Sequence, residues 1–223
     1  MLYSLLFELS YYPFHYKVII FLTFTLAVMI AITAHEFAHA FTAYKLGDNT
    51  PKIAGRLTLN PMAHFDKIGL FCFLFLGFGW AKPVPINSFN FKKVKRDCFL
   101  VSISGVVVNL ILAFIFCPFM MLLENVVASS IFAFITYAFV LYMFQANLVF
   151  MIFNLLPIYP LDGFNAIASQ LKYTNPFVLF MQKYGSIILL IVILVFNFTN
   201  IFNYLVYYIG SPISSFWRLI IKG

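Results

Sequence analysis

Long apolar runs alternate with short polar connections along the chain. They cover about residues 17–46, 98–123, 131–156 and 184–209, and each is longer than the roughly 20 apolar residues that a helix needs to cross the hydrocarbon layer. The pattern predicts membrane-spanning helices. Polar side chains in the second half of the first run indicate a role beyond crossing. The tail, residues 211–223, carries Trp217 and Arg218 and is expected to lie at the membrane interface.

The segment between the first two runs has a different pattern. Residues 68–81 are apolar but number only fourteen and include three glycines, which is typical of a re-entrant or tilted segment. Residues 53–60 and 84–91 are strand-like, and Pro83 and Pro85 oppose a helix there. The expected fold is an all-α polytopic membrane protein with five to six transmembrane or re-entrant segments and a small membrane-associated β-hairpin or sheet. Those strands would be either an edge that binds substrate or a plain surface hairpin.

The composition agrees with a chain dissolved in lipid. Of its 223 residues, 63% are hydrophobic and 9% are charged, and the mean hydropathy is +0.97. A soluble core of this size cannot hide so much apolar surface, so the lipid bilayer is its expected environment. We expect one membrane-embedded domain over residues 1–223, without an added soluble domain. The first residues lack a basic region and a cleavage site, so Met1 is expected to begin the mature chain.

The net charge of +7 is spread over short connections rather than over a soluble face, so nucleic acid is not an expected partner. If residues 68–81 re-enter the membrane, the connection 45–96 holds nine of the fourteen Lys and Arg residues, and the connection 124–130 holds none. The positive-inside rule then places the first connection in the cytoplasm, together with Lys172 and Lys183. The N-terminus would lie outside.

The first apolar run contains His35-Glu36-Phe37-Ala38-His39, an HExxH motif. Two histidines one helical turn apart can hold the same metal ion, and the glutamate beside them can serve as a general base. The motif gathers half of the chain's four histidines inside an apolar helix, where unpaired polar groups are costly. The alternative is a helix whose His and Glu side chains hydrogen-bond a neighbouring helix.

A catalytic zinc site takes a third protein ligand. Thr42 and Lys45 occupy the positions at which an extended metzincin motif has Gly and His, so this ligand must come from elsewhere. Asp162 stands out because Pro157 and Pro160 break the helix before it, and lipid tolerates a break only where it is buried or lines a cavity. The alternative is a turn that closes a span. The candidates considered are Asp48, His64, Asp66, Asp97, Glu124 and Asp162.

Six segments match a known family when taken together: HEFAHA, LGD, NPMAHFD, GWAKPVP, SGVVVN and NLLPIYPLDG. Over about residues 30–165 the chain resembles the site-2 protease family of intramembrane zinc metalloproteases, in its compact bacterial and archaeal branch without PDZ or CBS domains. The resemblance implies one Zn²⁺ per chain held by His35, His39 and Asp162. It also implies that Glu36 activates water and that Asn154 holds or polarises the scissile carbonyl.

The function implied is hydrolysis of peptide bonds within or near the transmembrane segments of single-span membrane proteins. The expected location is the inner (cell) membrane of a bacterium, with the active site towards the cytoplasm. A metal-ion transporter with intramembrane His and Asp residues is the main alternative, although it requires neither Glu36 nor Asn154. A catalytically inactive scaffold is another. No sequence feature identifies an individual substrate or an oligomeric state.

Three more polar residues each allow two interpretations. Asn109 lies within the run 98–123 and resembles the family's asparagine there; it either supports the active-site helices or makes an ordinary interhelical hydrogen bond. His64 and Asp66 lie in the polar connection and either stabilise a loop or bind metal.

Overall fold

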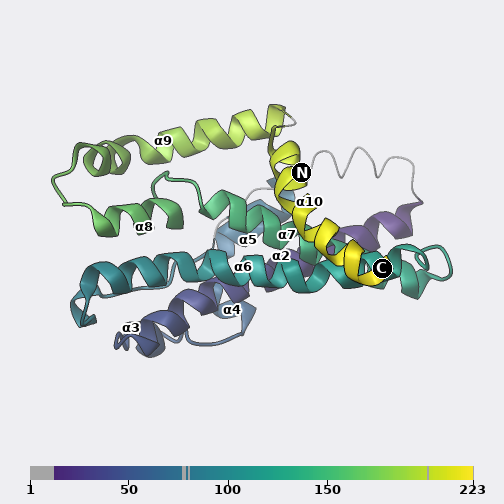
Figure 1. Ribbon diagram of the computed structural model, residues 1–223, viewed down its shortest axis with the longest axis horizontal. Helices are drawn as coiled ribbons and strands as arrows, with labels where there is room; N and C mark the ends of the chain where they lie inside the picture. The colour runs from purple at the N-terminus through teal and green to yellow at the C-terminus, as the bar shows by residue number, and fades with distance from the viewer. Residues whose placement is uncertain (1–12, 77–78, 80, 200, 223) are drawn as a thin grey trace.

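The computed structural model describes residues 13–76, 79, 81–199 and 201–222. Met1, the expected start of the mature chain, lies outside the described residues. Helices dominate the part that is described (Figure 1). Their bounds are α2 Phe14–Lys45, α3 Thr50–Ile53, α4 Pro61–His64, α5 Lys67–Leu76, the 3₁₀ turn η2 Ser88–Asn90, α6 Val94–Glu124, α7 Ile131–Asn154, α8 Asp162–Gln170, α9 Pro176–Phe198 and α10 Ile201–Lys222.

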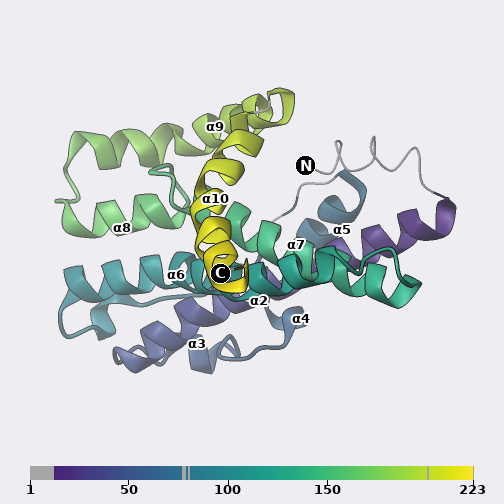
Figure 2. The same ribbon diagram turned by 45° about the vertical axis from the view of Figure 1, so that its right-hand side comes forward.

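Four of the described helices are long and apolar enough to span a membrane: α2, α6, α7 and the Pro176–Phe196 part of α9. The first three predicted runs, 17–46, 98–123 and 131–156, are therefore confirmed as helices of spanning length. The fourth prediction, 184–209, is wrong in its bounds. Thr199 ends α9 with an extended backbone (φ −124°, ψ 156°), and α10 begins at Ile201 in a new direction (Figure 2).

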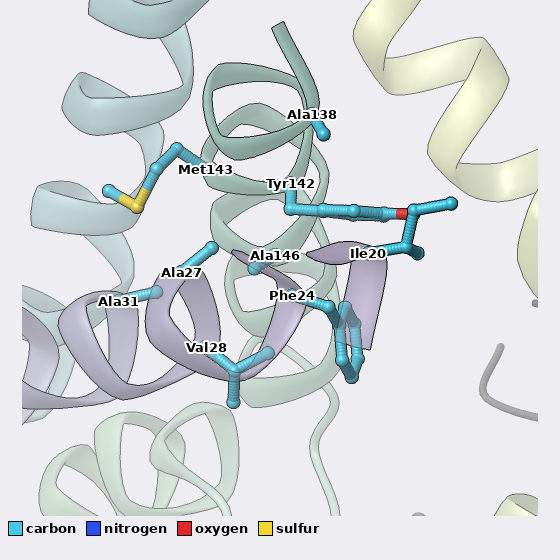
Figure 3. Close-up of a cluster of buried hydrophobic side chains, with 9 residues drawn as sticks. All are labelled: Ile20, Phe24, Ala27, Val28, Ala31, Ala138, Tyr142, Met143 and Ala146. Atoms are coloured by element: carbon cyan, nitrogen blue, oxygen red, sulfur yellow. The ribbon is translucent and has the colours of Figure 1, made fainter. Parts of the chain in front are cut away.

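Helices α2, α6 and α7 pack against one another and form the centre of the molecule, while α8 and α9 run beside each other on one side (Figures 1 and 2). Small side chains allow α2 and α7 to approach closely, since Ala27 and Ala31 are fully buried and Ala146 nearly so (Figure 3). The rings of Phe24 and Tyr142 meet edge to face at 5.5 Å. This packing fixes the half of α2 that precedes the HExxH motif. The cluster comprises Ile20, Phe24, Ala27, Val28, Ala31, Ala138, Tyr142, Met143 and Ala146.

Helix α10 lies across α6 and α7 and is attached by a specific hydrogen bond. Pro118, inside α6, has no N–H to donate to the carbonyl of Phe114, four residues earlier. Trp217 of α10 donates from Nε1 to that carbonyl at 2.9 Å. An unpaired carbonyl is costly in lipid, so this contact ties α10 to the bundle.

The predicted β-hairpin is not confirmed. Among the described residues there is one isolated antiparallel bridge, Phe65 to Ala81, and no strand. Residues 53–60 begin in helix α3, which is followed by Gly55 at φ +69°. Within 84–91, the backbone N–H of Asn87 donates to the Asp48 carboxylate at 2.8 Å, and Ser88–Asn90 form a 3₁₀ turn. A side chain therefore takes a backbone donor that a strand ladder would use.

The expected number of five to six membrane segments is likewise not confirmed. Helix α5 has ten residues, about 15 Å in length and roughly half of the hydrocarbon layer. The expected segment 68–81 also includes residues 77, 78 and 80, which lie outside the described residues.

Candidate metal centre

Three side chains from two distant parts of the chain converge beside α6. His35 and His39 lie one turn apart on α2, are both buried, and have their Nε2 atoms 3.1 Å apart. Asp162, the first residue of α8, places Oδ2 3.0 Å from His35 Nε2 and 3.1 Å from His39 Nε2. The structure therefore brings together the three residues that the sequence singled out as metal ligands, although 123 positions separate His39 from Asp162.

The outer nitrogens of both histidines face acceptors. His39 donates from Nδ1 to the carbonyl of Val101 at 2.7 Å, and His35 donates from Nδ1 to Asn109 Oδ1 at 2.6 Å. In a neutral imidazole that donates from Nδ1, Nε2 carries a lone pair. Two nitrogen lone pairs and a carboxylate oxygen thus point at one another without a hydrogen between them. A cation fits this arrangement, and two N ligands with one O ligand are a catalytic zinc set.

The position of Asp162 depends on a sharp reversal after α7. Helix α7 ends at Asn154, and α8 begins at Asp162 after a short turn. Gly163 lies against the carbonyls of Leu155 and Leu156, where a Cβ atom would clash. This close packing fixes where α8 begins, and the carboxylate of Asp162 thereby faces both imidazoles.

Helix α6 forms the back of the site and approaches the imidazoles at Gly105. A Cβ atom on Gly105 would lie 2.5 Å from His35 Cε1 and 2.6 Å from His39 Nε2. Any larger residue would displace the rings. The backbone of α6 thus sets how far the two histidines reach into the site.

A cleft opens from the three converging side chains towards the loop before α6. Glu36 and Asn154, both half-buried, contribute to its wall. Asn154 donates from Nδ2 to the carbonyl of Phe150 at 3.1 Å, within its own helix. The cleft therefore contains every residue proposed for catalysis from the sequence. Its lining is His35, Glu36, His39, Pro83, Val84, Ile86, Val101, Ser102, Asn154, Pro160, Asp162 and Asn165.

The front of the cleft is held by Asp48, which follows α2 and is fully buried. Its carboxylate accepts hydrogen bonds from the Thr50 hydroxyl at 2.6 Å, the Asn87 N–H at 2.8 Å and the Asn90 amide at 2.7 Å. Burial raises the pKa of Asp48, but these hydrogen bonds outweigh burial and hold it below its ordinary value. An ionised carboxylate thus ties the end of α2 to the loop that lines the cleft.

Comparisons with known proteins agree with this geometry. The chain is 42% identical over 189 residues to "Putative zinc metalloprotease YwhC" of Bacillus subtilis, which covers 81% of this chain and 82% of that protein. The chain belongs to the site-2 protease family. It is 30% identical to "Putative zinc metalloprotease Rip2" of Mycobacterium tuberculosis, over 74% of this chain and 63% of that protein. It is also 24% identical to the Rip2 of Mycolicibacterium smegmatis, over 85% of this chain and 78% of that protein.

No family model and no solved structure matches the chain. The relatives nevertheless decide the class of enzyme and its cofactor: this site-2 protease family member is a zinc metalloprotease, and its cofactor is Zn²⁺. The apolar helices of spanning length, four among the described residues, make it an integral membrane protein. The family resemblance found in the sequence is confirmed.

Three of the other candidates, His64, Asp66 and Asp97, are engaged elsewhere. His64 donates from Nε2 to the carbonyl of Thr58 at 2.8 Å. Asp66 accepts from the first backbone N–H groups of α5, and Asp97 accepts from the N–H of Lys93 at the start of α6. These contacts favour the loop-stabilising interpretation for His64 and Asp66.

Two residues at the site had no role in the sequence analysis. Gly105 was part of the SGVVVN segment, but only the structure shows its contact with both histidines. Asn147 of α7 lies one hydrogen bond further from His35, since its oxygen accepts from Asn109 at 2.7 Å and Asn109 in turn accepts from His35. Asn147 could have been found in the same way as Asn109, because it too is a polar residue inside an apolar run.

Proposed function

We propose that this protein is an intramembrane zinc protease that hydrolyses peptide bonds within or near the transmembrane segments of single-span membrane proteins. The observation that carries the proposal is the convergence of three side chains. His35 and His39 lie inside a helix of spanning length, α2, and Asp162 begins α8, which follows the spanning helix α7. The cleft beside them is lined in part by loop residues, so a peptide and water can approach from outside the helix bundle.

The proposed ligands are His35, His39 and Asp162. When bound, Zn²⁺ supplies a Lewis acid that polarises the scissile carbonyl and makes water more acidic. Glu36 is the general base, which removes a proton from the attacking water and delivers it to the leaving nitrogen. Its place on the cleft wall, next to His35 in the chain, suits this role.

Asn154 is the proposed donor to the carbonyl oxygen as negative charge develops on it. The amide group has two hydrogens, and one of them is directed at the Phe150 carbonyl, 3.1 Å away. That bond orients the amide on the cleft wall and leaves the second hydrogen for a substrate. A helical substrate must unwind to expose its carbonyl, and Pro83, Val84 and Ile86 offer a surface along which the unwound segment can lie.

We further propose that the active site faces the cytoplasmic side of a bacterial inner (cell) membrane. Lys95, at the basic start of α6, donates to the carbonyl of Gln170 at the end of α8, and the Gln170 amide donates back to the Lys95 carbonyl. These bonds of 3.0 and 2.9 Å support a common side for the basic connection and for α8, which begins with Asp162. The positive-inside rule makes that side cytoplasmic. The proposed partners of the protein are the lipid bilayer and single-span substrates, and nucleic acid is not among them.

The decisive experiment is a substrate trap followed by cleavage in liposomes. Glu36→Gln protein is purified from its native membrane, and the single-span proteins bound to it are identified and reconstituted with each variant. We expect Glu36→Gln to keep stoichiometric zinc by metal analysis and to cleave nothing, while the unaltered protein cuts within or near the spanning segment. Glu124→Gln, an exposed change at the far end of α6, is the matched control and should cleave normally.

Two outcomes would contradict this function. Cleavage by Glu36→Gln at the unaltered rate would remove the general base from the proposal. Zinc movement across the liposome membrane that changes in Glu36→Gln, with no proteolysis by either protein, would instead favour the transporter.

A further inference from the structure

Two asparagines lie buried behind the metal centre, within helices of spanning length. Among the described residues, Asn109 of α6 and Asn147 of α7 are the asparagines with no exposed surface. An amide that is not hydrogen-bonded is costly in such a place, so its partners determine how it is oriented. Those partners form a continuous series from α7 to His35.

The series begins at a group whose role is unambiguous. The carbonyl of Met143 only accepts, so the atom of Asn147 at 2.7 Å from it must be the donor Nδ2. The oxygen of Asn147 then faces Asn109, where it accepts from Nδ2 at 2.7 Å. The oxygen of Asn109 is thereby turned towards His35 Nδ1, at 2.6 Å. Asn109 Nδ2 also lies 3.4 Å from the carbonyl of Ala31, a longer contact that favours the same orientation, so the 2.7 Å bond to Asn147 is the shorter of the two that orient this amide.

The orientation of the Asn109 amide decides which ring nitrogen of His35 carries the hydrogen. An amide oxygen only accepts, so His35 Nδ1 must carry the hydrogen, and the lone pair lies on Nε2, which faces Asp162 and His39. We propose that Asn147 is a positioning residue of the metal centre, which acts through Asn109 to hold His35 with the Nε2 lone pair directed at the zinc. The inference rests on the proposed function, because it takes His35 as a metal ligand.

His39, one turn along the helix, also has its Nε2 lone pair directed at the metal site, but a different kind of group holds its ring. Its Nδ1 donates to the backbone carbonyl of Val101 at 2.7 Å, so no amide has to be oriented. A change at position 147 therefore affects one of the two imidazoles and leaves the other held. The expected effect is a weakened metal site rather than an abolished one.

The test uses two substitutions of Asn147 and a control beside it, all in the full chain purified in detergent micelles. In Asn147→Ser the hydroxyl can bond back to the Met143 carbonyl, as Thr23 and Thr33 do within α2, but it does not extend to Asn109. In Asn147→Asp an oxygen remains that accepts from Asn109. Leu148→Ala truncates the fully buried neighbour in the same helix, an apolar side chain that packs in a cluster with Val106 and Ala113 and has no polar atom to contribute to the series.

Two measurements report on the metal site without relying on activity. Zinc affinity is measured by competition with a chromophoric chelator, and the visible spectrum of the Co²⁺-substituted protein reports ligand geometry. Loss of a direct hydrogen-bond partner of a metal ligand, here Asn109, typically lowers metal affinity about 10-fold to 100-fold. Asn147 lies one hydrogen bond further from His35, so we expect Asn147→Ser to lower the affinity measurably, by no more than Asn109→Ala does, and to alter the cobalt spectrum. Asn147→Asp should recover most of the affinity. Leu148→Ala should lower the melting temperature and leave both metal readouts unchanged.

A double variant tests whether Asn147 acts through Asn109. If it does, Asn109→Ala combined with Asn147→Ser should have the zinc affinity of Asn109→Ala alone. Full addition of the two losses would overturn the proposed series. So would unaltered affinity in Asn147→Ser, or an equal loss in Leu148→Ala.

His35→Ala separates this inference from the proposed function. Loss of zinc in His35→Ala with full affinity in Asn147→Ser would overturn the positioning role alone. Full zinc affinity in His35→Ala would overturn the assignment of the ligand itself, and the positioning role with it. If Asn147→Ser does not accumulate as folded protein, Asn147→Thr, whose hydroxyl makes the same bond back to the Met143 carbonyl, takes its place in the comparison with Leu148→Ala.

Discussion

The two sides of the cleft are built in different ways. At the back, packed helices set the positions: the backbone of α6 meets both imidazoles at Gly105, and the carbonyl of Val101 accepts from His39. At the front, a loop is held by side chains, chiefly by the buried carboxylate of Asp48. Interlocked helices resist small shifts, whereas a loop held at a few points can adjust. The contrast suggests that the back determines metal binding and the front determines how a substrate lies.

The front loop is fixed at both ends. Lys82 donates its N–H to the carbonyl of His64 at 2.8 Å, and the buried guanidinium of Arg56 donates to the carbonyl of Lys82 at 3.3 Å and to that of Ala63. At the other end the N–H of Asn87 donates to Asp48. The cleft-lining residues of the loop lie between these two anchors, so a change at an anchor should move them without touching the three proposed metal ligands.

The largest expected effect comes from breaking the back of the cleft with Gly105→Ala. The new Cβ atom would lie 2.5 Å from His35 and 2.6 Å from His39, so both rings must shift. A displacement of about 1 Å at a reacting centre can cost about 10²-fold in rate. We expect most of the zinc to be lost by metal analysis and cleavage to fall by at least about that factor.

Gly210→Ala is the matched control for this prediction. Its Cβ atom would lie 3.0 Å from the flexible end of Leu148, away from the imidazoles. Zinc content and cleavage should stay close to those of the unaltered protein. If Gly105→Ala keeps full zinc and full activity, the back of the cleft does not fix the ligands.

A narrower effect, on kcat and not on zinc content, is expected for Asn154→Ala, which removes a proposed donor and leaves both sides of the cleft in place. Loss of one such donor typically lowers kcat by about 10² to 10³, with little change in KM. Zinc content should stay intact, and zinc and cleavage are measured on the same preparation. Zinc loss in this variant would instead show that Asn154 holds the end of α7 and, through it, Asp162.

The two sides also differ in how far they could be predicted from sequence. The pair His35 and His39 follows from helical periodicity, which is local in the chain. Asp162 was found because Pro157 and Pro160 break the helix before it, and lipid tolerates such a break only where it is buried in protein or lines a cavity. Both signals depend on residues close in sequence, and the structure places these three side chains together.

The predicted strands are not confirmed because an alternating pattern within one segment does not show which distant side chains bind its backbone N–H groups. Asp48 lies 39 positions before Asn87, yet it accepts the N–H that a strand would have used. Asn147 was missed for a similar reason, since its partner Asn109 lies on another helix, 38 positions away. Contacts of this kind are tertiary, and neither periodicity nor composition of a single segment contains them.

The smallest expected effect comes from loosening the front of the cleft with Asp48→Asn. Asparagine keeps the shape but loses the charge and one of the acceptor oxygens that hold Thr50, Asn87 and Asn90. A hydrogen bond contributes about 0.5–1.5 kcal/mol, which corresponds to a KM about 2-fold to 10-fold higher. Zinc content and kcat should not change. A loss of zinc in Asp48→Asn would remove the distinction between the two sides.

The pH dependence of stability tests the same carboxylate independently. The pKa of Asp48 is lowered in the folded protein, so its ionised form stabilises the fold above the unfolded pKa of about 3.9, and that contribution is lost as the pH falls through the folded pKa. The apparent melting temperature of the unaltered protein should therefore exceed that of Asp48→Asn by the most near pH 6–7, on the order of a few degrees. The difference should shrink towards pH 3. Both proteins are measured with a chelator present, so that zinc release at low pH does not contribute. A difference that stays constant over this range would show that the charge of Asp48 does not hold the loop, and the shape of its side chain would then be what matters.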